Sequence, residues 1–136
     1  MIKPIMHDSN FLTQKSMTAT KNDQAVLADL RDTLTAHQAE CVGMAANMIG
    51  IHKRIIICQM GILPVILVNP TIVKKSGPFT TKEGCLSLSG ERTTTRYQQI
   101  EVSYQDQNFN PQRQQFSGWI AQIIQHEIDH CDGVLI

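Results

Sequence analysis

Hydrophobic positions along the chain repeat with two different periods, and each period predicts a different kind of element. In the N-terminal third, four aliphatic residues recur at three- and four-residue spacing, as on one face of a helix. They are Val26, Leu27, Leu30 and Leu34. Asn22 or Asp23 is placed to cap this helix, which we expect to pack one face on the core.

The middle of the chain carries the period of β-strands instead. Residues 51–58 (IHKRIIIC) and 62–73 (ILPVILVNPTIV) are rich in β-branched residues. Three residues that interrupt strands punctuate this part of the chain: Gly61, Pro64 and Pro70. Further along, Ile100, Val102 and Tyr104 alternate with polar residues, which is the pattern of a half-buried strand. A mostly antiparallel sheet is the expected arrangement.

The C-terminal segment returns to the helical period. Residues 117–133 (SGWIAQIIQHEIDHCDG) begin with Ser117, a good N-cap, and finish at Gly133, which is placed to end a helix. An apolar stripe follows one face through Ile120, Ile123, Ile124 and Cys131. Glu127 continues this stripe, so we expect partly apolar surroundings that raise the pKa of its carboxyl group.

Composition narrows the class of protein. A length of 136 residues, with 42% apolar and 18% charged residues, is typical of one globular domain. The charges of twelve basic and twelve acidic residues cancel to a formal net charge of zero. The chain therefore has no excess of positive charge that would indicate binding to DNA, RNA or an anionic membrane surface. The longest apolar stretch, residues 55–68, is interrupted and too short to cross a bilayer. A small molecule or a peptide is the expected partner.

The expected compartment is the cytoplasm. The first residues, MIKPIMHDSNFL, lack the apolar run of a secretory signal, so we expect the four cysteines to be thiols. The cysteines occupy positions 41, 58, 85 and 131 and form no C-x-x-C pair. Any metal site must therefore recruit histidine.

The final helix carries suitable histidines. His126 and His130 lie four residues apart, which places both imidazoles on one face within reach of a single ion. Glu127 beside them completes the H-E-x-x-H arrangement of metallohydrolases. A catalytic site of this kind needs a third protein ligand and an open position for water. Because the chain ends soon afterwards, that ligand is expected upstream.

Three separated segments together resemble the motifs of the peptide deformylase family. They are CVGMAANMIG at residues 41–50, EGCLS at residues 83–87 and QHEIDH at residues 125–130. The resemblance covers most of residues 25–135 and implies an α+β fold, with antiparallel strands around a central metal-binding helix, as a single domain over residues 1–136. It also implies a divalent metal held by Cys85, His126 and His130. That metal is usually Fe(II) in the family, and Zn(II) or Ni(II) can substitute.

The activity that the resemblance implies is removal of the formyl group from N-terminal formyl-methionine, with release of formate. The metal lowers the pKa of a bound water and polarises the formyl oxygen. Glu127 moves a proton from that water to the leaving amine, while the backbone N–H of Leu86 donates a hydrogen bond to the oxyanion. The implied methionine pocket includes Val42, Gly43, Met48, Trp119 and Ile123. For Trp119, an ordinary core position is an equal alternative.

The sequence departs from the family's pattern at one informative position. Met48 stands where the family has a glutamine whose amide donates a hydrogen bond to the reacting oxygen. A thioether cannot donate, and loss of one such donor typically costs about a hundred- to a thousandfold in rate. We therefore expect a slow deformylase, unless the neighbouring Asn47 swings in as a substitute donor.

A second departure concerns the C-terminus. Family members usually continue into another helix or strand beyond the position of Gly133, and in some of them this element docks near the ribosomal exit. We therefore expect at most a weak contact with the ribosome, while the resemblance itself implies formylated peptide N-termini as partners. Arg96 opens a segment that matches a strand of the family, and we expect it to be structural.

Two alternatives remain open. The first is a catalytically idle paralogue that binds metal and formylated or apolar N-termini without hydrolysing them. Met48 supports it, whereas the intact set of metal ligands with Glu127 opposes it. The second is a zinc endoprotease that uses H-E-x-x-H with a different third ligand, and unchanged metal binding after Cys85→Ala would favour it.

Overall fold

A five-stranded antiparallel sheet forms the frame of the molecule, in the strand order β1-β2-β3-β4-β5. The computed structural model describes residues 1–136. The strands are β1 (Gly43–Ala45), β2 (Ile55–Met60), β3 (Leu63–Cys85), β4 (Leu88–Gln105) and β5 (Pro111–Ser117). The expected antiparallel arrangement is confirmed, and Ile100, Val102 and Tyr104 alternate into the core along β4.

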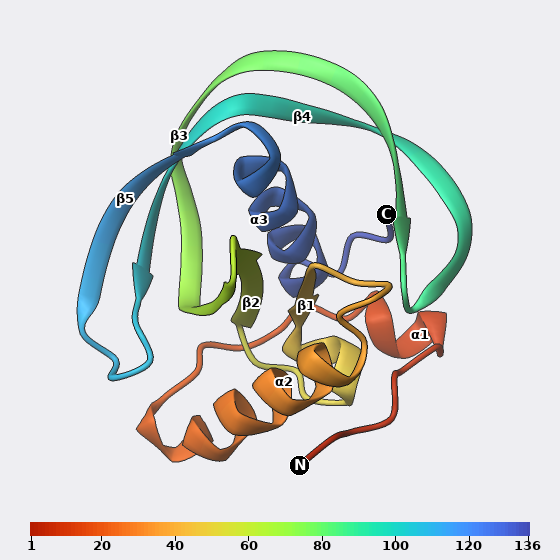
Figure 1. The fold of residues 1–136 in the computed structure, drawn as a ribbon, viewed down its shortest axis with the longest axis vertical. Helices are drawn as coiled ribbons and strands as arrows, with labels where there is room; N and C mark the ends of the chain where they lie inside the picture. Colours follow the sequence, from red (N-terminus) through yellow and green to blue (C-terminus); the bar gives the residue numbers. More distant parts are fainter.

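Strands β3 and β4 form a long hairpin that arches over the C-terminal helix, as Figure 1 shows. Their register runs from Val68 opposite Gln105 to Cys85 opposite Leu88, and it shifts twice near the start of β3. Such irregularities bend a strand and increase its twist. The bend brings the far end of β3, and Cys85 with it, back to the helix.

The prolines that punctuate this part of the chain do so without ending a strand. Pro64 and Pro70 both lie inside β3. Pro70 falls within the first register shift, between Val68 and Thr71, and Pro64 lies opposite Gln59 near the turn of the β2–β3 hairpin. Proline is tolerated at bulges and strand ends because its missing N–H costs no ladder hydrogen bond there.

Three α-helices and two 3₁₀ turns complete the fold. They are α1 (Ser9–Leu12), η1 (Lys21–Asp23), α2 (Gln24–Ala36), η2 (Ala46–Ile49) and α3 (Gly118–Cys131). Ser117 occupies the N-cap position of α3 as predicted, although its hydroxyl accepts no capping hydrogen bond. Gly133 follows the end of α3 with a positive φ of 75°, as expected for a residue that ends a helix.

Asp23, one of the two residues predicted to cap the first long helix, occupies the N-cap position of α2, although its side chain makes no capping hydrogen bond there. Thr20 caps the preceding η1, and its hydroxyl accepts a hydrogen bond from the Asn22 N–H at 3.3 Å. The carboxylate of Asp23 in turn accepts one from the Thr20 N–H at 2.8 Å, which completes a capping box. Because η1 leads directly into α2, side-chain capping occurs upstream of the start that the hydrophobic period indicates.

Strand β2 lies between two hydrophobic clusters, because successive side chains of a strand point to opposite faces. Ile56 and Cys58 pack in the cluster that also contains the apolar face of α3. Ile55 and Ile57 pack in the cluster that contains Leu27, Leu30 and Leu34 of α2. Full burial of each such aliphatic side chain stabilises the fold by about 1.5–3 kcal/mol. The helix that carries the histidines is therefore held firmly against the sheet.

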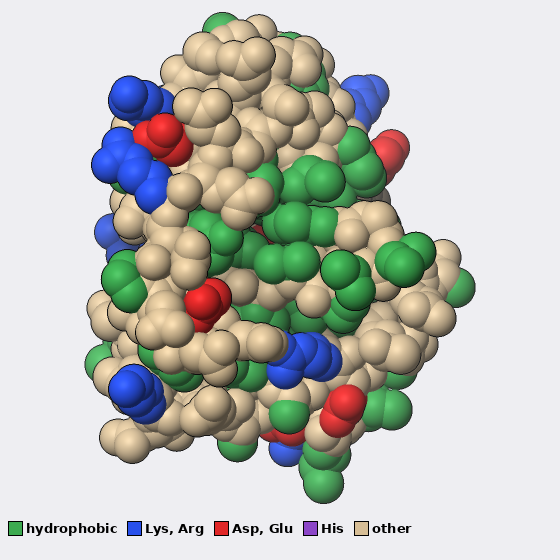
Figure 2. All heavy atoms as spheres, turned by 60° about the vertical axis from the view of Figure 1, so that its left-hand side comes forward, with side chains coloured by type: hydrophobic (Ala, Val, Ile, Leu, Met, Phe, Trp, Pro, Cys, Tyr) green, Lys and Arg blue, Asp and Glu red, His purple; other side chains and the backbone are tan.

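The surface is unevenly divided between polar and apolar side chains. Figure 2 shows a face on which hydrophobic side chains gather around a hollow in the middle, with charged side chains mainly toward the edges. Trp119, at the start of α3, is 62% exposed. None of the helices is long and apolar enough to span a bilayer.

Replacing Gly133 by alanine should destabilise the fold more than replacing Gly90. Both glycines have a φ of +75°, which disfavours any side chain by about 1–2 kcal/mol. A Cβ at Gly133 would lie 2.4 Å from the carbonyl oxygen of Thr13, whereas a Cβ at Gly90 would meet nothing within 4 Å. We expect Gly133→Ala to lower the free energy of unfolding by about 1–3 kcal/mol more than Gly90→Ala. Urea denaturation measures both, and equal losses would contradict this prediction.

Candidate active site

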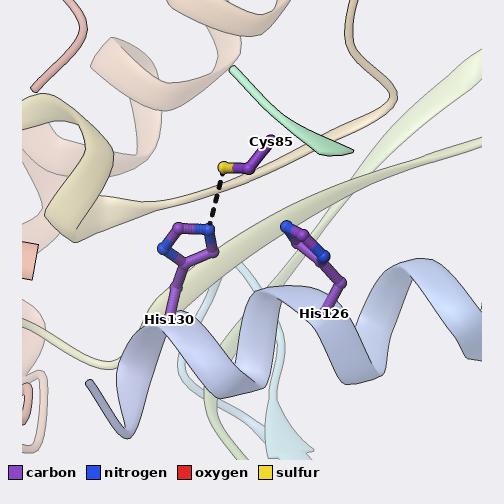
Figure 3. Close-up of side chains that lie close together, drawn as sticks. All are labelled: Cys85, His126 and His130. Atoms are coloured by element: carbon purple, nitrogen blue, oxygen red, sulfur yellow. Dashed lines mark hydrogen bonds between the residues drawn. The ribbon is translucent and has the colours of Figure 1, made fainter. Parts of the chain in front are cut away.

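Three ligand atoms converge where the end of β3 meets α3. The Cys85 sulfur and one ring nitrogen from each of His126 and His130 lie within 4.8 Å of one another. Figure 3 shows the sulfur pointing toward the two imidazoles, which rise from successive turns of α3. Cys85 Sγ lies 3.1 Å from His130 Nε2. The helix alone brings the histidines together, and the β3–β4 arch adds the cysteine.

This donor set fits a divalent metal ion. A thiolate and two imidazoles suit iron, zinc and related metals, and three protein ligands leave a coordination position for water or substrate. Burial, together with the nearby charges of His126 and Arg96, lowers the pKa of His130 to about 3. The His130 imidazole is therefore neutral near pH 7, which is the form that binds a metal.

Glu83 fixes the orientation of the first histidine. Its Oε1 accepts a hydrogen bond of 2.8 Å from His126 Nδ1, which leaves Nε2 as the nitrogen available to a metal. The guanidinium of Arg96 and the amide of Gln122 also donate to Glu83. Burial opposes ionisation of Glu83, but the hydrogen bonds from His126, Arg96 and Gln122 outweigh it and hold its pKa at about 2.

Arg96 connects this arrangement to α3 a second time. Its Nη2 donates to Glu83 at 2.7 Å and its Nη1 donates to Asp129 at 2.7 Å. Arg96 is buried, so the structural role expected for it is confirmed. The role of Glu83 was missed from the sequence. The available signal was its position two residues before Cys85 on a strand, which places both side chains on one face.

Glu127 is a buried carboxyl group without a hydrogen-bond partner for its Oε1. Burial raises its pKa from the ordinary 4.5 to about 7, as the apolar stripe on α3 predicts. Gly43 makes room for it, because a Cβ there would lie 3.0 Å from Glu127 Oε2 and 2.7 Å from Ile123 Cγ2. A carboxyl group poised near neutral pH can both accept and donate a proton.

A cavity of about 400 Å³ opens beside these groups. All five residues predicted for the methionine pocket line it, namely Val42, Gly43, Met48, Trp119 and Ile123. Cys85, Leu86, His126 and Glu127 also line the cavity, whereas His130 lies behind them. Because Trp119 is largely exposed at the cavity, the alternative that it is a core residue is wrong. Sequence reasoning missed the charged residues of the wall, Glu40, Lys82 and Glu91.

The residues after β1 do not supply a second side-chain donor to the cavity. Met48 lines it, and the Met48 sulfur accepts a hydrogen bond of 3.5 Å from the Ala45 N–H. The hypothesis that Asn47 swings in as a donor is wrong, because its fully buried amide donates instead to the His130 carbonyl oxygen at 3.0 Å. The Leu86 N–H, by contrast, is engaged in no hydrogen bond within the protein.

Replacing Glu83 by glutamine should weaken metal binding by about 10- to 100-fold. The neutral amide leaves Arg96 with Asp129 as its remaining carboxylate partner, and it accepts the Nδ1 proton of His126 less strongly, so the tautomer that binds metal through Nε2 is less favoured. Competition with a chromophoric chelator measures the affinity. Glu101→Gln is the matched control, since Glu101 forms a surface ion pair with Arg113 far from the ligands. Equal affinities for both variants would contradict the role of Glu83.

Glu127 should make the stability of the metal-free protein depend on pH. A carboxyl group whose pKa is raised on folding binds a proton more tightly in the folded chain, so folding is favoured at low pH and this advantage is lost as pH rises from about 4.5 to about 7. The difference in unfolding free energy between wild type and Glu127→Gln should fall by about 3 kcal/mol across that range. Urea titrations at several pH values measure it, and a flat difference would contradict the raised pKa.

Comparison with known proteins places this geometry in a family. The family model described as polypeptide deformylase matches residues 2–136. The chain is 57% identical over 136 residues to a peptide deformylase of Clostridium beijerinckii, and the match covers 100% of both proteins.

Solved structures agree with the sequence relatives. A peptide deformylase from Thermotoga maritima superposes with a TM-score of 0.89 at 28% identity, covering 99% of this chain and 95% of that one. A Met-Ala-Ser-bound class I type b peptide deformylase from Acinetobacter baumannii superposes with a TM-score of 0.89 at 25% identity, covering 99% and 97%. The expected α+β fold is confirmed, and nothing in these matches favours the idle alternative. This chain belongs to the polypeptide deformylase family and is a metal-dependent hydrolase that removes the N-formyl group from peptides.

Proposed function

We propose that Cys85, His126 and His130 hold the metal and that Glu127 is the general acid and base of the deformylation. The observation that carries this assignment is the position of Glu127. It is a buried carboxyl group with a pKa of about 7 and an unpartnered oxygen, and it lines the same cavity as two of the three ligands. No other carboxyl group of the cavity combines these properties, because Glu40 and Glu91 are exposed and the pKa of Glu83 is held at about 2.

The substrate we propose is a peptide with an N-terminal formyl-methionine. The cavity offers apolar walls against which an unbranched thioether side chain can pack, formed by Val42, Met48, Trp119 and Ile123. The A. baumannii structure contains Met-Ala-Ser, a peptide that begins with methionine. The charged wall residues Glu40, Lys82 and Glu91 would then face the peptide beyond the methionine.

Proton transfer in this site falls to Glu127. When bound, the metal supplies Lewis acidity that makes water a nucleophile near neutral pH and draws electron density from the formyl oxygen. Glu127 accepts the proton that the water loses and delivers it to the amine that leaves as the C–N bond breaks. The Leu86 N–H donates a hydrogen bond to the oxygen on which negative charge develops. Formate and a peptide with a free N-terminus are the products.

Met48 limits the stabilisation of that developing charge. Its thioether sulfur has no proton to donate, so the Leu86 N–H acts without a side-chain partner from this segment. We therefore infer a deformylase whose chemical step is slower than the metal, the base and the pocket would otherwise allow. Enzymes commonly accelerate reactions a millionfold or more, so loss of one donor leaves substantial turnover.

Fe(II) is the metal we propose, from the family resemblance, and the Cys/His₂ set also accepts Zn(II) or Ni(II). An iron site beside a thiolate is sensitive to oxidation, so activity should be preserved under anaerobic conditions. The weak contact with the ribosome and the cytoplasmic location stay predictions.

Replacing Met48 by glutamine should raise kcat/KM for a formyl-Met tripeptide by about a hundredfold, because it restores a donor to the oxyanion. The Ala45 N–H that now meets the sulfur can bind the new carboxamide oxygen, which leaves the NH₂ group to donate. Formate release by protein loaded anaerobically with Fe(II) or Ni(II) is the measurement.

Two matched variants make this experiment decisive. Met48→Leu keeps an apolar side chain of similar volume and should give no gain, which separates the donor from repacking of the cavity. Glu127→Gln should abolish turnover while retaining metal. If the wild type holds metal but releases no formate, the idle alternative replaces the proposed function.

A further inference from the structure

Asn47 links the segment after β1 to the metal-binding helix. It lies in η2, is fully buried, and its Nδ2 donates a hydrogen bond of 3.0 Å to the backbone carbonyl oxygen of His130. This is a contact across 83 residues of sequence, and it is made to a proposed metal ligand itself. The Asn47 amide therefore lies directly against the turn of α3 that carries His130.

Each of these two residues also has a polar side-chain atom without a hydrogen-bond partner, and the structure contains no hydrogen bond between these two atoms. They are Asn47 Oδ1, an acceptor, and His130 Nδ1, and both are buried. Cys85 Sγ lies 3.1 Å from Nε2 of His130, so Nε2 is the nitrogen that faces the metal site. An imidazole that binds a metal through Nε2 carries its proton on Nδ1, and that N–H almost always has an acceptor.

The Nδ1 proton of His126 has a carboxylate acceptor, whereas that of His130 has none. The Nδ1–H of His126 donates to the carboxylate of Glu83 at 2.8 Å, so this ligand has a charged acceptor. No carboxylate bonds to Nδ1 of His130. A second ionised carboxylate there would add another negative charge to a buried site that already holds Glu83 and the Cys85 thiol. A neutral amide oxygen accepts the same proton without that charge.

We propose that Asn47 is a positioning residue for His130. Its amide nitrogen holds the backbone of the ligand, and its amide oxygen receives the Nδ1 proton when Nε2 binds metal. Each histidine would then donate its Nδ1 proton to a different kind of acceptor. His126 donates to the charged carboxylate of Glu83, and His130 would donate to the neutral amide oxygen of Asn47. This inference rests on the proposed assignment of His130 as a ligand.

Ser16 is the competing acceptor. Its hydroxyl oxygen is also buried without a partner, and its backbone N–H donates to the carbonyl oxygen of Cys131 at 2.8 Å, one residue beyond His130. Asn47 is favoured because it bonds to His130 itself and is fully buried, whereas Ser16 is only half-buried. Ser16→Ala is therefore the discriminating variant.

The test measures binding of Co(II) to the metal-free full-length protein, by chelator competition and by the visible absorption of the bound ion. Asn47→Leu should lower the affinity by about 10- to 100-fold and change the ligand-field bands. Ser16→Ala should leave both unchanged, as should Thr33→Val, which removes a buried acceptor of the Lys3 N–H far from the site. Wild-type affinity and spectrum in Asn47→Leu, or an equal loss in Ser16→Ala, would overturn the proposal.

Two further variants separate the possible failures. If Asn47→Leu does not fold, as judged by circular dichroism of the metal-free protein, Asn47→Ala carries the test, since it removes both amide groups without adding bulk. A loss of affinity of about tenfold or more supports the proposal, and affinity within about threefold of wild type overturns it. Cys85→Ala reports on the proposed function instead. If Cys85→Ala binds Co(II) as tightly as wild type, the metal centre is wrongly assigned. If Cys85→Ala loses affinity but Asn47→Leu keeps the affinity and spectrum of wild type, only the role of Asn47 fails.

Discussion

The buried ion pair between Glu83 and Arg96 joins the arch of this enzyme to its catalytic helix. Glu83 lies on β3, Arg96 on β4, and both reach α3 through His126 and Asp129. Removing either residue would leave the charge of the other buried without its partner, which costs several kcal/mol, so closing the arch over the helix requires both residues. Cys85 lies two residues beyond Glu83, and the closed arch is also what brings its sulfur to the histidines.

The same constraint separates the roles of two carboxyl groups that lie close together. Glu83 is surrounded by donors and stays ionised, with a pKa of about 2. Glu127 has an oxygen without any donor, is fully buried, and has a pKa of about 7. Pairs of groups whose surroundings push their pKa values apart mark a division of labour in an active site. Glu83 orients a ligand, whereas Glu127 is able to move protons.

The departure at Met48 acts on a different part of the chemistry. The proposed ligands, the proposed base and the apolar walls of the cavity are present together, as expected for a member of the polypeptide deformylase family. In the proposed mechanism, the thioether removes one hydrogen-bond donor to charge that exists only during the reaction. That mechanism assigns this donor no part in metal binding, so a change at this position is expected to alter the rate while it leaves the rest of the site intact.

Local sequence determined the elements and placed two of the three proposed metal ligands together. The period of the apolar residues gave the two long helices and the alternation along β4, and the four-residue spacing alone placed His126 and His130 on one face. The family motifs added Cys85. Tertiary structure decided what depends on contacts between distant segments: that Glu83 accepts from His126, that Asn47 bonds to His130 instead of entering the cavity, and that Pro70 fits within a bulge of β3. Periodicity fixes the face on which a side chain lies, but the partner it meets depends on how distant segments pack together, as the contact between Asn47 and His130, 83 positions apart, shows.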